Sequence, residues 1–384
     1  MPFCVRYLKK SFLCNNVFFN FNLVMANQIY SVIKGTGSYV PPKVVKNEDF
    51  LQNEFYTPAG DKMTKPTKVV VEKLKEITEI DERRHVEDQY VTSDIAAFAG
   101  SKAIKSSGID KESLDYIIVA HNFGDVSKET GRTDILPSLA SKVKHLLKIE
   151  NPFCVAYDLL FGCPGWVQAL TQADLYIKTG EAKRVLVIGA ETLSRVSDPY
   201  DVDSMIYSDG AGAAIVEAVQ SDTPVGILAH VTRTDTLENA FLLKMGSSYN
   251  KEIDPKEQFL KMNGRKVYEY ALHTVPSTVK KCLEKADVDI TDVKTVLIHQ
   301  ANAKMDYAIL ARLFKLYGLR EVPEYTMPMT ISKLGNNSVA TIPVLFDMLM
   351  TKELENHQLK SGDHFVFTSV GAGMNINAVV YQMP

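Results

Sequence analysis

The sequence predicts an α/β fold made of two similar halves. Short runs rich in β-branched residues alternate with amphipathic helical patterns, which is typical of buried sheets covered by helices. The chain also contains a long, imperfect internal repeat, because three pairs of similar segments follow one another in the same order. We therefore expect two halves, at about residues 26–220 and 221–384, that face each other across a pseudo-twofold axis.

Local patterns predict the individual elements. Apolar, β-branched runs predict strands over residues 114–121, 153–159, 183–191, 212–219, 294–300, 364–371 and 377–382. Helices are predicted over residues 93–108 and 301–318, each of which ends on a glycine. Another helix should begin after Cys163, because Pro164 suits the first helical position, where no N–H is needed. Cys163 is then the predicted N-cap residue.

The repeat places Cys163 of one half opposite Asn336 of the other. DYIIVAHNF resembles KTVLIHQAN, and FGCPGWVQALTQADLYI resembles LGNNSVATIPVLFDMLM. SDGAGAAIVEA resembles SVGAGMNINAVV, and we interpret each as a Gly-Ala-Gly hairpin followed by a strand. Cys163 and Asn336 each follow a glycine at a predicted helix start, and His299 ends a predicted strand. We expect all three to meet where the halves face each other.

Composition excludes several classes of protein. With 43 basic and 46 acidic side chains, the net charge of −3 gives no overall attraction to nucleic acid or anionic membranes. After residue 25, no run reaches the ~18 consecutive apolar residues that a membrane-spanning helix needs. The five cysteines show no CxxC pair and no metal-ligand spacing, which favours a reducing cytoplasm. We interpret residues 1–25, basic and then aromatic-rich, as an extension outside the core, with Met25 as a possible true start. A signal peptide is the alternative, but asparagines interrupt the apolar stretch that it would need.

Cys163 is the strongest candidate nucleophile. The N–H groups and dipole of a helix start favour negative charge, so we expect a lowered thiol pKa there. Cys154 and Cys282 lie within apolar patterns and are expected to be buried packing residues. His121 and His230 are likewise expected to be hydrogen-bonded residues of the core.

Seven segments together resemble a known family. GTGSYVPP, DLLFGCPGWVQAL, DGAGAA, MNGRKVYEYAL, HQANAKM, GNNSVATIP and GAGMN are similar, in this order, to landmarks of β-ketoacyl-acyl carrier protein synthase III, over about residues 29–384. The resemblance implies a thiolase-like fold, layered α/β/α/β/α, without metal or cofactor. It also implies a cytoplasmic homodimer that condenses an acyl-CoA or acyl-carrier starter with malonyl-carrier protein, with loss of CO₂, in fatty acid biosynthesis.

The resemblance implies a Cys-His-Asn triad. Cys163 would accept the acyl group, while His299 and Asn336 would hold a thioester carbonyl oxygen. The backbone N–H groups of Cys163 and Ala372 are the expected oxyanion hole. Because a carrier protein is acidic, a basic docking surface is expected at Lys304, which matches a basic contact of the family, and at three residues around MNG. These three are Lys261, Arg265 and Lys266.

Departures from the family pattern leave the acyl donor open. Lys73 and Ile77 stand where relatives that use short acyl-CoA have a CoA-clasping Trp and Arg, and DPYDVDSMIYSDG contains no basic residue. The loop HNFGDVSKETGRTD, expected to cap the acyl tunnel, is longer than usual. Alternatives are therefore a specialised relative that joins longer or aryl acyl chains, as in dialkylresorcinol synthesis, or an acyl transferase. A hydroxymethylglutaryl-CoA synthase would need Glu129 as its base, and a binding or scaffold protein would not need the triad.

Overall fold

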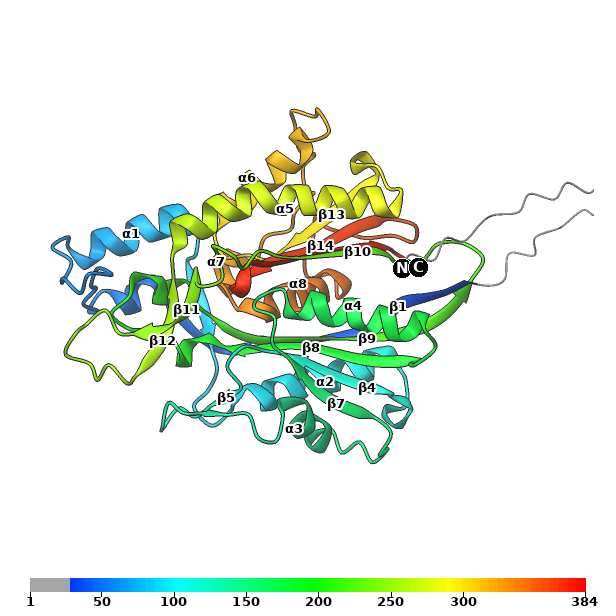
Figure 1. Cartoon of the computed structure of the whole chain (residues 1–384), viewed down its shortest axis with the longest axis horizontal. Helices are drawn as coiled ribbons and strands as arrows, with labels where there is room; N and C mark the ends of the chain where they lie inside the picture. Colours follow the sequence, from blue (N-terminus) through cyan, green and yellow to red (C-terminus); the bar gives the residue numbers. More distant parts are fainter. Residues whose placement is uncertain (1–27) are drawn as a thin grey trace, which may run out of the picture.

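The computed structural model describes residues 28–384, so the predicted extension at residues 1–25 lies outside the described part. Two central sheets alternate with three layers of helices (Figure 1). The first sheet contains, from edge to edge, β1 (Gln28–Tyr39), β9 (Asp209–Ser221), β8 (Arg184–Thr192), β4 (Tyr116–Ala120) and β7 (Val155–Leu159). The second contains β10 (Gly226–Thr234), β15 (Asn375–Gln382), β14 (His364–Gly371) and β13 (Val293–Ile298).

The two sheets repeat one pattern of strand pairing. β1, β9 and β8 pair antiparallel and β8 pairs parallel with β4, while β10, β15 and β14 pair antiparallel and β14 pairs parallel with β13. The two halves are therefore similar in architecture, as the repeat predicted. The boundary near residue 220 stays a prediction.

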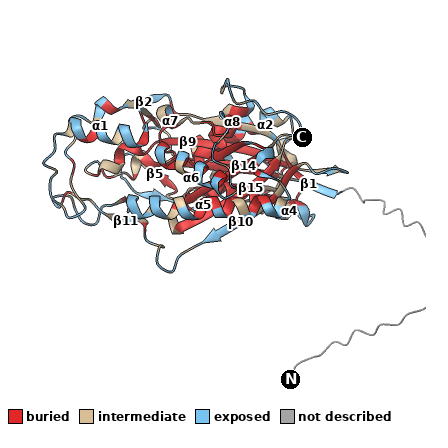
Figure 2. Ribbon diagram, turned by 90° about the horizontal axis from the view of Figure 1, so that it is seen from above, coloured by how far each residue is buried: buried red, intermediate tan, exposed pale blue. Residues whose placement is uncertain are grey.

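Helices separate and cover the sheets. α4 (Gly165–Lys178) and α8 (Thr341–Met350) lie between the sheets, because α4 contacts β8 and β15 while α8 contacts β9 and β13. α2 (Thr92–Ser107) and α3 (Leu139–Leu146) cover the first sheet. α5 (Gly264–Ala286) covers the second, with α6 (Ala303–Lys315) packed on it. Buried residues gather on the strands and middle helices, and exposed ones on the outer helix faces (Figure 2).

Trp166 links these layers. Its side chain is fully buried near the start of α4, and its Nε1 donates to the Val187 carbonyl oxygen of β8 at 3.3 Å. Its ring meets that of Phe367, on β14, edge to face at 5.5 Å. Because one side chain contacts both sheets, the start of α4 is held firmly between the halves.

Smaller elements surround one end of the molecule. They are α1 (Thr67–Thr78), α7 (Ile331–Leu334), and three two-stranded sheets: β2 (Lys43–Lys46) with β3 (Glu82–His85), β5 (Asp125–Val126) with β6 (Thr133–Asp134), and β11 (Leu243–Ser247) with β12 (Gln258–Met262). The long loop predicted after β4 contains β5 and β6.

Most predicted elements are confirmed, and two details were wrong. All the predicted strands are present, as β4, β7, β8, β9, β13, β14 and β15, and the two predicted helices as α2 and α6. The first Gly-Ala-Gly segment is not a hairpin, because Gly210 and Gly212 lie within β9, whose small residues pair with β1. The N-cap of α4 is Pro164, one residue after the predicted Cys163.

Candidate active site

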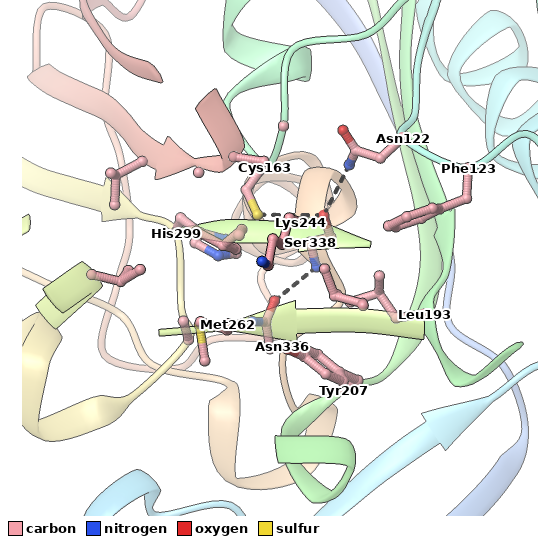
Figure 3. A pocket seen from close by; sticks show the side chains of 18 of the residues that line it. Asn122, Phe123, Cys163, Leu193, Tyr207, Lys244, Met262, His299, Asn336 and Ser338 are labelled. Atoms are coloured by element: carbon pink, nitrogen blue, oxygen red, sulfur yellow. Dashed lines mark hydrogen bonds between the residues drawn. The ribbon is translucent and has the colours of Figure 1, made fainter. Parts of the chain in front are cut away.

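The three residues predicted to meet line one cavity between the halves. Cys163, His299, Asn336 and Ser338 all contribute to its wall (Figure 3). Ala372 lines it as well. The cavity has a volume of about 240 Å³ and is otherwise mostly apolar. This is smaller than the roughly 300–1,000 Å³ of typical small-molecule pockets, so it suits a small reacting group.

Two glycines allow the backbone to come close around Cys163. Gly162 adopts φ +67°, and a Cβ on it would lie 2.7 Å from the Ala372 nitrogen. A Cβ on Gly371 would lie 2.5 Å from the Cys163 nitrogen. Only glycine fits at either point. The segments that carry the two predicted oxyanion-hole N–H groups are therefore neighbours.

The predicted low thiol pKa of Cys163 was wrong for the free protein. Burial raises the pKa of the Cys163 thiol to about 11, although a hydrogen bond from Ser338 acts in the opposite direction. Burial disfavours the charged thiolate more than the neutral thiol, because the thiolate loses its hydration. The thiol is therefore mainly protonated near neutral pH. Cys154 and Cys282 are buried, as predicted.

His299 is a buried, neutral imidazole. It follows β13, is 4% exposed, and its backbone N–H donates to the Thr368 carbonyl oxygen at 3.0 Å. Burial lowers the pKa of His299 to about 4. A neutral imidazole donates through one ring nitrogen and accepts through the other, so His299 can hold an oxygen atom or take up a proton.

The orientation of Asn336 is set by its own neighbours. Its Oδ1 accepts the backbone N–H of Ser338 at 2.9 Å, which leaves the amide NH₂ group free to donate. Its backbone forms a bridge with Tyr207: Asn336 N donates to Ile206 O at 2.9 Å, and Ser208 N donates to Asn336 O at 2.8 Å. The backbone on either side of Tyr207, at the end of η4 (Val202–Ile206) and before the predicted boundary near residue 220, therefore positions an amide of the C-terminal half.

A partly buried hydrogen-bonded chain beside Cys163 was not predicted from the sequence. Ser338 Oγ donates to Cys163 Sγ at 3.4 Å, and Asn122 Nδ2 donates to Ser338 Oγ at 3.3 Å (Figure 3). Asn122 Nδ2 also lies 2.6 Å from the carboxylate of Glu191, which is fully buried at the end of β8. Burial raises the pKa of Glu191 to about 7. Ser338 adopts φ +52°, a conformation rare for non-glycine residues and often found at functional sites.

The four predicted docking residues do not share one environment. Lys261 is buried, and its ammonium pairs with Asp198 at 2.5 Å and with Asp201 at 3.0 Å. Its charge is therefore not available to a carrier protein, and the prediction for Lys261 was wrong. Arg265 and Lys266 are exposed at the start of α5, and Lys304 is exposed at the start of α6.

The other predicted positions lie outside the cavity wall, except for one loop residue. Lys73 and Ile77 are exposed on α1, and Glu129 is exposed in the loop between β5 and β6. Glu129 therefore does not meet Cys163, which disfavours the hydroxymethylglutaryl-CoA synthase alternative. Phe123 of the same loop lines the cavity (Figure 3). His121, also in this loop, pairs with Asp158 at 3.0 Å as a core residue.

Within residues 28–384, no group of three or more His, Cys, Asp or Glu side chains could hold a metal ion. No helix of this part is long and apolar enough to cross a membrane.

Comparisons with known proteins match both halves. The family model for 3-oxoacyl-[acyl-carrier-protein] synthase III matches residues 157–236, and its C-terminal counterpart matches residues 283–383. A β-ketoacyl-[acyl-carrier-protein] synthase III of Halalkalibacterium halodurans is 34% identical over 343 residues, which cover 89% of this chain and 95% of that protein.

Solved structures agree with these matches. The 3-oxoacyl-[acyl-carrier-protein] synthase III of Aquifex aeolicus has a TM-score of 0.73 at 29% identity, covering 92% of this chain and 99% of that one. The priming β-ketosynthase of the R1128 polyketide pathway has a TM-score of 0.75 at 25% identity, covering 94% and 97%. The predicted thiolase-like fold is confirmed, and the chain belongs to the 3-oxoacyl-[acyl-carrier-protein] synthase III family.

Proposed function

We propose that this chain is a condensing acyltransferase that joins an acyl thioester starter to malonyl-carrier protein, with loss of CO₂, in fatty acid biosynthesis. The observation that carries the proposal is the presence of Cys163, His299 and Asn336 on one cavity. Relatives named as synthases of this type support the reaction class.

In the first half-reaction, Cys163 takes the acyl group. Sγ forms a bond to the donor carbonyl carbon, and the bond from that carbon to the donor sulfur breaks. Because the thiol is protonated in the free protein, its proton must leave during attack. We assign its transfer to the neutral imidazole of His299, which returns it to the released thiol. The N–H groups of Cys163 and Ala372 stabilise the oxyanion.

In the second half-reaction, the malonyl group loses CO₂. The electron pair of the broken C–C bond forms an enolate, whose oxygen accepts hydrogen bonds from His299 and from the Asn336 amide. The enolate carbon attacks the acyl carbonyl, the bond from that carbon to Cys163 sulfur breaks, and the released thiolate takes a proton from water. Each donor contributes about 3 kcal/mol to lowering the barrier, as single oxyanion-hole donors do.

Carrier docking is assigned to Arg265, Lys266 and Lys304. All three are exposed at the starts of neighbouring helices, where they can attract an acidic protein. The charge reversal Lys304→Glu should raise KM for carrier-bound donors and not for small thioesters. Lys315→Glu, at the other end of α6, is the matched control. Equal effects of Lys304→Glu on both donor types would contradict this assignment.

We also propose a cytoplasmic homodimer formed through β7. This strand is an edge of the first sheet and is flanked by exposed apolar side chains. Phe153, Val155 and Leu160 are 85%, 47% and 63% exposed. A second copy that pairs with this edge would cover both the apolar surface and the free backbone groups. Sedimentation at micromolar concentration should give twice the monomer mass.

A specialised ketosynthase, for longer or aryl chains, is the second candidate. The positions of the usual CoA clamp carry Lys73 and Ile77, and the loop before β9 carries Asp198 and Asp201 instead of an arginine. These features disfavour a CoA donor. The small cavity, by contrast, favours a short acyl group.

Intact mass measurement tests the covalent step. Wild type, Cys163→Ala and Cys282→Ala are mixed with acyl-CoA, acyl-carrier and small acyl thioester donors of several lengths. We expect a donor-specific mass gain in wild type and Cys282→Ala but none in Cys163→Ala. Addition of malonyl-carrier protein should then remove the acyl group as a β-ketoacyl product. If no donor modifies the wild type, the proposed function is wrong.

A further inference from the structure

The Tyr207 hydroxyl is a buried polar group that the proposed reaction does not use. Tyr207 lines the same cavity as Cys163 (Figure 3) and is only 3% exposed. Among residues 28–384, no atom forms a hydrogen bond with this hydroxyl.

The ring cannot easily turn away from the cavity. Its apolar part packs in a cluster that includes Leu193, Leu260 and Ile331. The backbone on either side of Tyr207 is hydrogen-bonded to Asn336. The hydroxyl is therefore held in place by the same contacts that position the Asn336 amide.

The phenol stays neutral under working conditions. Burial raises the pKa of Tyr207 well above its usual range, and the nearby Asp203 acts in the same direction. A neutral phenol donates one hydrogen bond and accepts others. The hydroxyl oxygen itself is buried, with almost no surface open to water. A purely alkyl chain in the cavity would therefore leave it without a hydrogen bond.

The other polar side chains around the cavity are already accounted for. Asn122 bonds to Glu191, and Ser338 bonds to Cys163. Lys244 reaches the cavity wall from β11 but is exposed, so water can solvate its ammonium. Tyr207 is thus the fixed, buried group without a protein partner or an assigned role.

We propose that the Tyr207 hydroxyl pairs with an oxygen atom of the acyl chain, so that the donor is an oxygenated acyl thioester of the hydroxyacyl or oxoacyl class. This inference rests on the proposed function, because the acyl chain enters the cavity when it is transferred to Cys163. A site that hydrogen-bonds a substrate oxygen discriminates strongly against an analogue that lacks it.

The test compares matched donors on the same protein. The rates of acylation by butyryl, 3-hydroxybutyryl and 3-oxobutyryl thioesters of N-acetylcysteamine are measured by intact mass for wild type, Tyr207→Phe and Tyr317→Phe. Tyr317 is the control, because its hydroxyl also lacks a partner but it does not line the cavity. The ratio of oxygenated to alkyl donor is the readout, since partial misfolding lowers both rates together.

We expect wild type and Tyr317→Phe to prefer an oxygenated donor by about tenfold, the usual scale for one buried hydrogen bond. Tyr207→Phe should reduce this preference to near unity. A ratio near one in wild type, or an unchanged ratio in Tyr207→Phe, would overturn the inference while acylation itself still supports the proposed function. Failure of all three donors, while an acyl-CoA or acyl-carrier donor without a chain oxygen still acylates Cys163, would overturn the inference alone. Failure of every donor would refute the proposed function as well.

Discussion

Replacing Ser338 by alanine tests how Cys163 is activated. In the protein, Ser338 Oγ donates to Cys163 Sγ at 3.4 Å, and this bond opposes the effect of burial on the thiol pKa. The substitution Ser338→Ala removes this donor. It leaves the backbone N–H of residue 338, and therefore its bond to Asn336 Oδ1, in place.

The size of the effect follows from the charge on sulfur. A hydrogen bond to a charged group contributes about 1.5–3 kcal/mol, and sulfur is a weaker acceptor than oxygen, so we take about 1.5 kcal/mol. That energy favours the thiolate over the thiol. Its loss should lower the thiolate fraction of Cys163, and with it the rate of alkylation or acylation, about tenfold at a fixed pH.

Alkylation by iodoacetamide, followed by peptide mass mapping, gives the assay. The rate at Cys163 should rise with pH up to about 11 in wild type, because burial raises the thiol pKa to that value. Ser338→Ala should be about tenfold slower at every pH below this. Ser31→Ala, which removes a buried, unpartnered hydroxyl on β1, is the control and should match wild type. Equal rates in Ser338→Ala and wild type would refute the activating role, and a wild-type plateau near neutral pH would refute the argument from burial.

Three further predictions concern stability, measured by urea denaturation. Burial raises the pKa of Glu191 from 4.5 to about 7, so its contribution is fully present below pH 4.5 and is lost as pH rises through 7. Between pH 4.5 and 7, the unfolding free energy of Glu191→Gln should therefore rise by about 3 kcal/mol relative to that of wild type. A difference between the two proteins that does not change with pH would contradict this prediction. Lys261→Met leaves Asp198 and Asp201 buried without a cation and should lower the unfolding free energy by about 3–5 kcal/mol. Lys256→Met, at an exposed position, is the control and should change it little, so similar losses in the two variants would refute the role of the buried ion pairs. Gly335→Ala should lower the unfolding free energy by about 1–3 kcal/mol, because the backbone angles of Gly335, φ 60° and ψ −161°, are essentially restricted to glycine. Gly318→Ala should lower it less, because a Cβ there would meet nothing within 4 Å.

The sequence predicted the parts of the fold that depend on local pattern. β-branched runs identified the central strands, and the Cys163-Pro164 pair identified the start of α4 to within one residue. The strand β1 and the hairpin of β11 and β12 were not predicted, because exposed or polar residues interrupt their patterns.

The errors at the site arise from contacts between distant residues. Lys261 reads as a surface lysine, but Asp198 and Asp201 lie about sixty residues away and enclose it. The thiol pKa depends on how much protein surrounds Cys163, which no short motif encodes. Glu191 likewise gave no sequence signal, because its burial and its bond to Asn122 exist only once β4 and β8 lie side by side.

The bridge between Tyr207 and Asn336 makes the two similar halves of the fold interdependent. The amide is encoded late in the chain, yet hydrogen bonds to Ile206 and Ser208, encoded much earlier, fix its height in the cavity. Recombination between relatives that exchanged only one half would combine Asn336 from one parent with the segment around Tyr207 from another. Residues 206–208 and 335–338 should therefore be inherited together, and chimeras of this family should be cut so that both segments come from the same parent.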